Sequence, residues 1–252
     1  MYLLIALLAI AVLSIAFVWY TRRIWFFRDP DHTRTSQEDL TLRSPVYGRV
    51  AYIRRIKNGE VESEKKGERI LIEDITKDKW PAEFPQGDGW LIGIAMTALD
   101  VHYQYSPLPA KVGEIFHHTH GRNLPMFDLW EYVRITWLRR GVQLFAKKYV
   151  FENERQTMWL HGKHVTLALV LIADKFVSKI TTFVKTGDEV PSGGKLSFIG
   201  RGSQVDVVVC GVSDLQIEVA PGQAVCGPLT ILATLKIPAP RPRGAAEPAQ
   251  MP

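Results

Sequence analysis

The chain has 252 residues, of which 46% are hydrophobic and 23% are charged. These are ordinary globular values, so the composition excludes global disorder and a collagen-like chain. With 31 Lys+Arg against 26 Asp+Glu the formal net charge is +5, which favours an anionic partner without choosing between nucleic acid and a lipid surface. Two cysteines, Cys210 and Cys226, are too few for a disulfide framework or a four-ligand zinc site.

The first twenty residues, MYLLIALLAIAVLSIAFVWY, contain one small polar side chain, Ser14. As a helix they would span roughly 30 Å, the thickness of a bilayer's hydrocarbon core. A buried core helix is the alternative, but such helices usually keep a polar face. A cleavable signal peptide carries its basic residues before the apolar run, whereas Arg22 and Arg23 follow it here. We therefore expect a transmembrane anchor over 1–23, in a single-pass protein of the cell membrane whose following domain is cytoplasmic by the positive-inside rule.

The rest of the chain is predicted to be mostly β structure. Residues 24–43 are expected to form an interfacial segment and a linker, and 237–252, rich in Pro and Ala, a disordered tail. Between them, 44–236 contains short apolar runs separated by glycine-rich turns, which is typical of strands. The expected strands are Arg49–Ile56, Arg69–Glu73, Trp90–Ala95, Lys111–Phe116, Gln156–His161, Val165–Ile172, Lys179–Val184, Lys195–Ile199, Gln204–Val209, Leu215–Val219 and Leu229–Leu235.

Two internal echoes predict repeated hairpins. SPVYGRV at 44–50 resembles SPLPAKV at 106–112, and GDEVPSG at 187–193 resembles GQAVCG at 222–227. The second pair is typical of turns in biotinyl/lipoyl-type sandwiches, where glycine supplies the backbone angles of a sharp reversal. We expect a mainly β fold, a β-sandwich or barrel with biotinyl/lipoyl-like hairpins and few helices, preceded by one transmembrane helix.

After the anchor, the strongest helix candidate is Asp128–Val150. Its apolar residues can share one face while its basic residues lie mostly elsewhere. Two interpretations stay open: the helix lies on an anionic membrane surface, or it packs on the sheet with a solvated basic face. Gly141 could split it.

Several kinds of site are not expected. His117, His118 and His120 suggest a metal, but neighbouring side chains on a strand point to opposite faces, so at most His118 and His120 converge. No third ligand has motif spacing, and we expect no metal site. Gly202-Ser203 lacks the glycines of a hydrolase nucleophile turn, and neither a Walker-type loop nor a basic array typical of nucleic-acid binding is present.

Six short motifs, taken together and in order, resemble those of phosphatidylserine decarboxylases. The resemblance covers about residues 24–235 and is strongest to the short bacterial and archaeal form of that family. The motifs are FFRDPD at 26–31, SPVYG at 44–48, LDVH at 99–102 followed by SP at 106–107, ENER at 152–155, VKTGDEV at 184–190 and GSQVD at 202–206.

The resemblance implies a proenzyme whose cofactor is a covalent pyruvoyl group made from Ser203. Ser203 would attack the carbonyl of Gly202, so that the chain splits into a β chain ending at Gly202 and an α chain beginning at residue 203. The pyruvoyl ketone then accepts the electron pair released when phosphatidylserine loses carbon dioxide and becomes phosphatidylethanolamine. His102 matches the family's histidine and is the candidate proton donor or substrate-orienting group. The stretch around His118 and His120 is a candidate for head-group binding.

The chain departs from the family at one motif. Tyr47 stands where the family has an aspartate, and Tyr105 where the longer form has a second histidine. Neutral tyrosine cannot replace the charge of a carboxylate, so Asp100 and Asp206 join the two tyrosines as candidate assistants of maturation. The alternative function is an uncleaved, catalytically silent lipid-binding relative. Expected partners are a phospholipid substrate, an anionic membrane surface, the chain's own α fragment and a second copy in a homodimer, with no nucleic acid.

Overall fold

The computed structural model describes residues 2–30, 32, 40–62, 69–78, 89–119, 121, 123–175, 180–200, 203–212 and 215–236. Gly202, His120, residues 31 and 33–39 of the predicted linker and the predicted disordered tail 237–252 lie outside these residues.

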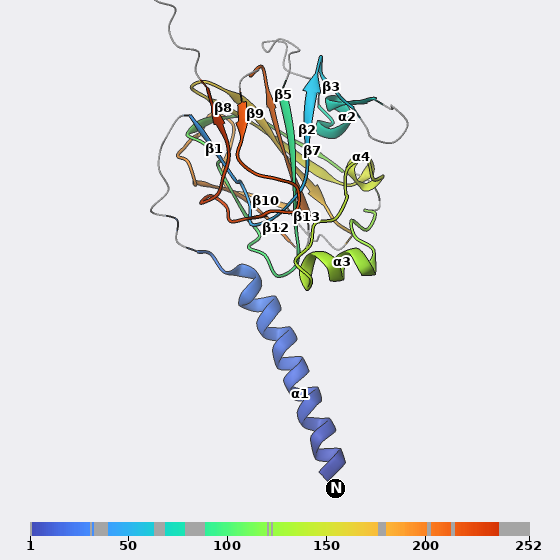
Figure 1. The fold of residues 1–252 in the computed structure, drawn as a ribbon. Coiled ribbons are helices and arrows are strands. Elements are labelled where there is room, and N and C mark those ends of the chain that lie inside the picture. The colour runs from blue at the N-terminus through green and yellow to red at the C-terminus, as the bar shows by residue number, and fades with distance from the viewer. Residues whose placement is uncertain are drawn as a thin grey trace, which may run out of the picture.

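The N-terminal helix projects from the β domain (Figure 1). α1 (Tyr2–Arg23) has 22 residues and ends in a short 3-10 turn, η1 (Trp25–Phe27). At 1.5 Å per residue it is about 33 Å long. None of its apolar window is buried against the rest of the chain, so it is not a core helix. By length and composition it could cross a membrane, as the sequence predicts.

The domain that follows is mainly β, which confirms the predicted fold class. The elements after η1 are β1 (Thr41–Arg43), β2 (Gly48–Lys57), β3 (Glu60–Glu62), β4 (Arg69–Leu71), α2 (Ile72–Thr76), β5 (Gly89–Met96), β6 (Tyr103–Tyr105), β7 (Ala110–His118), α3 (Leu129–Thr136), α4 (Tyr149–Glu152), β8 (Arg155–Gly162), β9 (Thr166–Ala173), β10 (Ile180–Thr182), β11 (Glu189–Val190), β12 (Lys195–Ile199), β13 (Ser203–Cys210), β14 (Leu215–Ile217), β15 (Ala224–Val225) and β16 (Ile231–Leu235).

One large antiparallel sheet organises the domain. Its strand order is β11-β7-β8-β9-β13-β5-β2-β3-β4, and β15 also pairs with β2. One face packs against two smaller sheets, β1-β16-β14 and β10-β12-β6, and the other face is covered by α2, α4 and the segment after α3. Both faces of β9 and β13 are buried, which explains why β9 is a nearly continuous apolar run, whereas β13 also buries Ser203, Gln204 and Asp206.

The two predicted echoes form equivalent strand pairs, but not hairpins, because the paired strands are far apart in the chain. In each, a glycine with positive φ, Gly187 at 96° or Gly222 at 87°, turns the chain. The backbone N–H of Gly187 then donates to Val112, and that of Gly222 to Val50, at 2.8 and 2.7 Å. β11 pairs with the start of β7 just as β15 pairs with the start of β2. The sequence repeat therefore corresponds to an internal structural repeat.

Several predicted elements are wrong in extent. The strands expected over Leu215–Val219 and Leu229–Leu235 are each two residues too long. The strand expected over Arg69–Glu73 stops at Leu71, because α2 begins there and buries Ile72 and Ile75 on one helical face. The helix expected over Asp128–Val150 is divided into α3 and α4.

The division of the long helix has a packing reason. Asp128 and Glu131 form a capping box that starts α3, yet the helix ends at Thr136, before Gly141. Left-handed residues follow, among them Arg139 with φ 54°. They let the chain turn back and bury Leu144 against the sheet, which a continuous helix would not allow.

Candidate active site

The residue predicted as the cleavage point begins a central strand. Ser203 is the first residue of β13 and pairs with Met96 at the end of β5 and with Ala173 at the end of β9. Its side chain is fully buried, and its Oγ donates to Met96 Sδ at 3.3 Å. Among the described residues this is the only hydrogen bond of that hydroxyl. Strand partners on both sides therefore fix the backbone of a serine that lies in an apolar environment.

His102 lies in the turn that leaves β5 at the same end of the sheet. The Asp100 carboxylate accepts hydrogen bonds from Thr97 N and Thr97 Oγ1 at 2.7 and 2.8 Å, which closes the turn. The Asp100 carbonyl accepts from His102 Nδ1 at 2.8 Å. Because a carbonyl can only accept, the proton is on Nδ1 and the lone pair on Nε2. That Nε2 is buried without a hydrogen-bond partner in the described part of the chain, and burial lowers the pKa of His102 to about 4.

Aromatic residues at the end of α1 cover this histidine. The Phe26 ring lies 4.0 Å from the His102 ring, centroid to centroid. Phe27 stacks on Phe198 of β12, with centroids 5.2 Å apart and planes at 15°. The juxtamembrane turn therefore forms a wall of the site.

Polar contacts join the same turn to the domain. Trp25 Nε1 donates to the Leu99 carbonyl at 3.3 Å, and the Arg28 guanidinium donates to the same oxygen. Asp29 forms an ion pair with Lys195 of β12. These contacts fix the end of the apolar helix beside the turn that carries His102.

Tyr47 and Tyr105 lie in a cluster with Asp29 and His32, which follow η1. Tyr47 Oη is 2.7 Å from His32 Nε2, and Tyr105 Oη donates to Asp29 at 3.3 Å. The His32 ring also packs edge-on against Tyr105, with centroids 4.6 Å apart. Burial raises the pKa of both tyrosines, so both are neutral phenols at physiological pH. Neither forms a hydrogen bond with Ser203 in the described structure.

Asp206 is on the opposite face of β13 from Ser203. Tyr52 Oη donates to its carboxylate at 2.7 Å, and Gln204 Nε2 donates at 2.7 Å. Tyr149 Oη completes this buried network by donating to Gln204 Oε1 at 2.6 Å. Burial raises the pKa of Asp206 to about 7. The sheet therefore separates this carboxyl from the serine hydroxyl.

The histidine-rich stretch begins at the end of β7. His118 is exposed. The strand register aligns it with the start of β13, with β8 and β9 in between. At the usual strand spacing His118 is therefore about 14 Å from the start of β13. His117 Nε2 contacts Glu154 at 2.9 Å, and His120 lies outside the described residues. No cluster of metal ligands is found among the residues that the structure describes.

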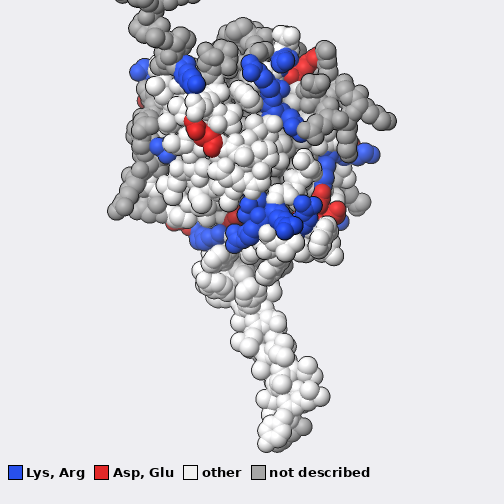
Figure 2. Space-filling view, in the orientation of Figure 1, with Lys and Arg blue, Asp and Glu red and all other residues white. Residues whose placement is uncertain are grey.

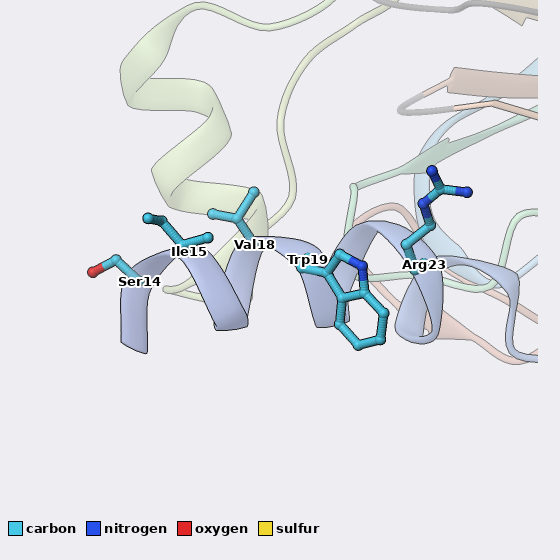
Figure 3. A pocket seen from close by; sticks show the side chains of 5 residues that line it. All are labelled: Ser14, Ile15, Val18, Trp19 and Arg23. Atoms are coloured by element: carbon cyan, nitrogen blue, oxygen red, sulfur yellow. The ribbon is translucent and has the colours of Figure 1, made fainter. Parts of the chain in front are cut away.

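A cavity of about 340 Å³ adjoins this end of the sheet. Tyr47 and Asp100 line it, together with three arginines from separate segments: Arg28, Arg49 and Arg139. Figure 3 shows a second hollow, of about 470 Å³, whose walls come from α1 alone. The residues that line this second hollow are Ser14, Ile15, Val18, Trp19 and Arg23.

Comparisons with known proteins identify the family of the chain. The family model for phosphatidylserine decarboxylase matches residues 19–233, so the chain belongs to the phosphatidylserine decarboxylase family. The members of this family are carboxy-lyases, and the chain is a decarboxylase in this general sense.

Curated relatives cover most of the chain. A phosphatidylserine decarboxylase proenzyme of Syntrophotalea carbinolica is 27% identical over 93% of this chain and 89% of its own. One from Saccharopolyspora erythraea is 27% identical over 84% of this chain and 72% of its own. A protein of Methanocaldococcus jannaschii, assigned as an archaetidylserine decarboxylase proenzyme, is 28% identical over 83% and 88%.

Sequence reasoning missed several residues of this site. Phe26 belongs to a motif that the sequence singled out, but its packing on His102 depends on how α1 meets the domain. Met96 becomes a neighbour of Ser203 through strand register, which no local pattern reveals. Arg49 and Arg139 are 90 positions apart in the chain, and only the tertiary fold brings them to one cavity.

Proposed function

We propose that the chain cleaves itself between Gly202 and Ser203, and that the matured enzyme decarboxylates a serine phospholipid at the membrane. The observation that carries the proposal is the buried placement of Ser203, at the start of a strand held on both sides, at the same sheet end as His102. Intramolecular attack is favoured where the fold holds a hydroxyl next to the carbonyl of the preceding residue, because the entropy cost of bringing the two groups together is then part of folding.

The self-cleavage reaction needs only the chain and water. Ser203 Oγ adds to the Gly202 carbonyl carbon, the amide C–N bond breaks, and the nitrogen takes up the proton, which gives an ester. Loss of the α-proton of residue 203 and cleavage of its Cβ–O bond then release Gly202 as a carboxylate. The dehydroalanine that remains takes up water, loses ammonia and becomes the pyruvoyl cap.

The residues around position 203 fit such a cap. The ladder with β5 and β9 would hold the new N-terminus of the α chain, and the Gln204 side chain is clamped by Tyr52 and Tyr149. Met96 supplies an apolar neighbour that excludes water. When present, a pyruvoyl group supplies an electron sink for the carbon–carbon bond that breaks in decarboxylation.

His102 is the proposed proton-handling residue. Its unpartnered Nε2 is the one buried side-chain nitrogen in this turn that can accept and return a proton. Without substrate the imidazole of His102 is neutral, because burial lowers the pKa of His102 to about 4. An anionic substrate beside it would raise that pKa, so substrate binding would bring the imidazole into a range useful for proton transfer. Phe26 keeps bulk water from this nitrogen.

The membrane supplies the substrate in this proposal. Lys and Arg gather in a band along the base of the β domain, close to where α1 leaves it (Figure 2). Trp130 on α3 and Trp137 directly after it are exposed, with 63% and 73% of their surface accessible. Exposed tryptophans of this kind are typical of a helix that lies in a lipid interface. We place the domain on the cytoplasmic face, with α1 as its single anchor and acyl chains packed along α1. Whether the lipid is a diacyl or an archaeal type does not change the chemistry.

The test is decarboxylation of phosphatidylserine by purified full-length protein in detergent. The wild-type chain should release carbon dioxide, and Ser203→Ala should remain one chain with no activity above background. Circular dichroism melting of both proteins controls for folding. A Ser203→Ala protein that still decarboxylates the lipid would refute the pyruvoyl mechanism. A folded wild-type chain with neither cleavage nor activity would favour the silent lipid-binding alternative, which Tyr47 motivates.

A further inference from the structure

Three arginines from three separate segments converge on the 340 Å³ cavity. Arg28 follows η1, Arg49 lies near the start of β2, and Arg139 lies in the loop after α3. Guanidinium groups repel one another, so their convergence in one concave site is unfavourable unless something anionic compensates.

Two of the three guanidinium groups are held in place by backbone carbonyls. Arg28 donates to the Trp25 carbonyl at 2.8 Å and lies 4.2 Å over the Trp25 ring. Arg49 donates to the Gly222 carbonyl at 2.6 Å. Because a guanidinium carries five N–H donors, each group still has donors for a ligand.

The third arginine is positioned by a strained loop. Arg139 has a φ of 54°, in the left-handed region that favours glycine. Two residues on, Gly141 packs so closely on Gly222 that a Cβ there would lie 2.9 Å from the Gly222 Cα. This contact fixes the loop beside Arg49, which is itself bonded to Gly222. In the described structure Arg139 makes no hydrogen bond or ion pair. The pKa of Arg49 is lowered mainly by burial and further by the charge of Arg139.

One acidic residue in the cavity faces three arginines. Asp100 lines the wall, and its negative charge acts on Arg28 and Arg49, but it can offset only one of the three positive charges. The cavity therefore combines an excess of positive charge with unused, directional donors, and this combination suits the oxygens of a phosphate group.

The place of the cavity favours a lipid phosphate. Its wall includes Trp25, directly beyond α1, at the level where head groups would lie if α1 spans the bilayer. Ala95 and Thr97 also line it, so the cavity lies at the end of β5 that pairs with Ser203. The side chain of Met96 between them points to the opposite face of the sheet, where it contacts the Ser203 hydroxyl.

We propose that this cavity binds the phosphodiester of the substrate head group through Arg28, Arg49 and Arg139. This inference rests on the proposed function and adds the subsite that would hold the lipid while its serine moiety reacts at position 203.

The binding test uses full-length Ser203→Ala protein in detergent and isothermal titration calorimetry. The probes are glycerophosphoserine, a water-soluble diester, and inorganic phosphate. The diester should bind at least as tightly as phosphate, and Arg139→Gln should weaken its binding about tenfold or more, the effect of one charge-assisted hydrogen bond. Arg140→Gln is the matched control, because it removes the same charge one residue away, at an exposed position outside the cavity lining.

Kinetics of the otherwise wild-type enzyme separate this inference from the proposed function. Arg139→Gln should raise KM for phosphatidylserine about tenfold with a smaller change in kcat, while Arg140→Gln keeps the wild-type KM. Equal effects of the two variants, or binding of phosphate without the diester, would overturn the lipid subsite. If wild-type protein matures and Arg139→Gln keeps its KM, only the subsite is wrong. If wild-type protein never matures, the proposed function itself fails.

Discussion

At the residue scale, the burial of His102 makes the folding stability depend on pH. Its pKa of about 4 in the folded protein lies below the ordinary 6.5, so the unfolded state binds more protons between those values. Folding stability contributed by the neutral ring is therefore complete above about pH 6.5 and is lost as the pH falls towards 4. The difference corresponds to about 3 kcal/mol.

A His102→Gln variant should lack this dependence. We expect the stability advantage of wild type over the variant to shrink by about 3 kcal/mol between pH 7 and pH 4, because glutamine does not titrate there. Denaturant unfolding at several pH values measures it. A constant difference between the two proteins across that range would mean that His102 is not buried as described.

The comparison must be between variants because Asp206 acts in the opposite direction. Burial raises its pKa to about 7, above its ordinary 3.8, so its contribution is complete at low pH and is lost as the pH rises through 7. In wild type the two trends partly cancel between pH 4 and 6.5. His102→Gln removes one of them and leaves the other unchanged, since His102 is absent from the groups that shift the pKa of Asp206.

At the scale of elements, the turn after α1 is a wall of the candidate active site as well as a connection. Phe26 covers His102, whereas its neighbour Phe27 is half exposed and stacks on Phe198. Phe26→Ala should admit water to Nε2 of His102 and lower kcat about tenfold or more. Mobile water would then replace the fixed protein groups that surround the imidazole during proton transfer.

Phe27→Ala is the control for that substitution. It removes an aromatic ring of the same size from the same turn without uncovering His102, so kcat should stay near wild type. The measurement is the initial rate of carbon dioxide release with both proteins normalised to the cleaved fraction. Equal losses in the two variants would show that the turn acts only as a structural support.

The long elements were predictable because their patterns are long. β9 follows from a continuous apolar run and the later part of β13 from three successive valines. The two repeated strand pairs follow from sequence echoes with a glycine at each reversal. Strands of two or three residues, such as β6 and β15, have no period to detect. The predicted helix was longer than α3 because apolar periodicity does not reveal that Leu144 is buried against the sheet. This burial takes the chain away from the helix axis.

The site was predictable only in its local parts. The turn holding Asp100 and His102 is contiguous in sequence, so its motif identifies it. The face on which Asp206 lies depends on strand register, and it places this residue with Tyr52 rather than with Ser203. The convergence of arginines depends on the close approach of Gly141 to another segment, a contact between loops that carries no sequence signal.

At the scale of the whole molecule, an apolar helix and a basic band lie on one side of the domain (Figures 1 and 2). The turn that carries His102 contacts the segment directly after that helix. This arrangement would let a lipid be decarboxylated without leaving the bilayer, since its head group need move only between the interface and the adjoining site. Unlike the family aspartate, neutral Tyr47 brings no negative charge to this end of the sheet. Self-cleavage is consequently the step on which the account depends.

Intact mass spectrometry of the purified full-length protein tests that step most directly. We predict two fragments, residues 1–202 with a free carboxylate and residues 203–252 capped by a pyruvoyl group. Hydroxylamine or borohydride treatment should change the mass of the smaller fragment only. A single folded chain of 28.5 kDa that persists after prolonged incubation with phosphatidylserine would contradict the account.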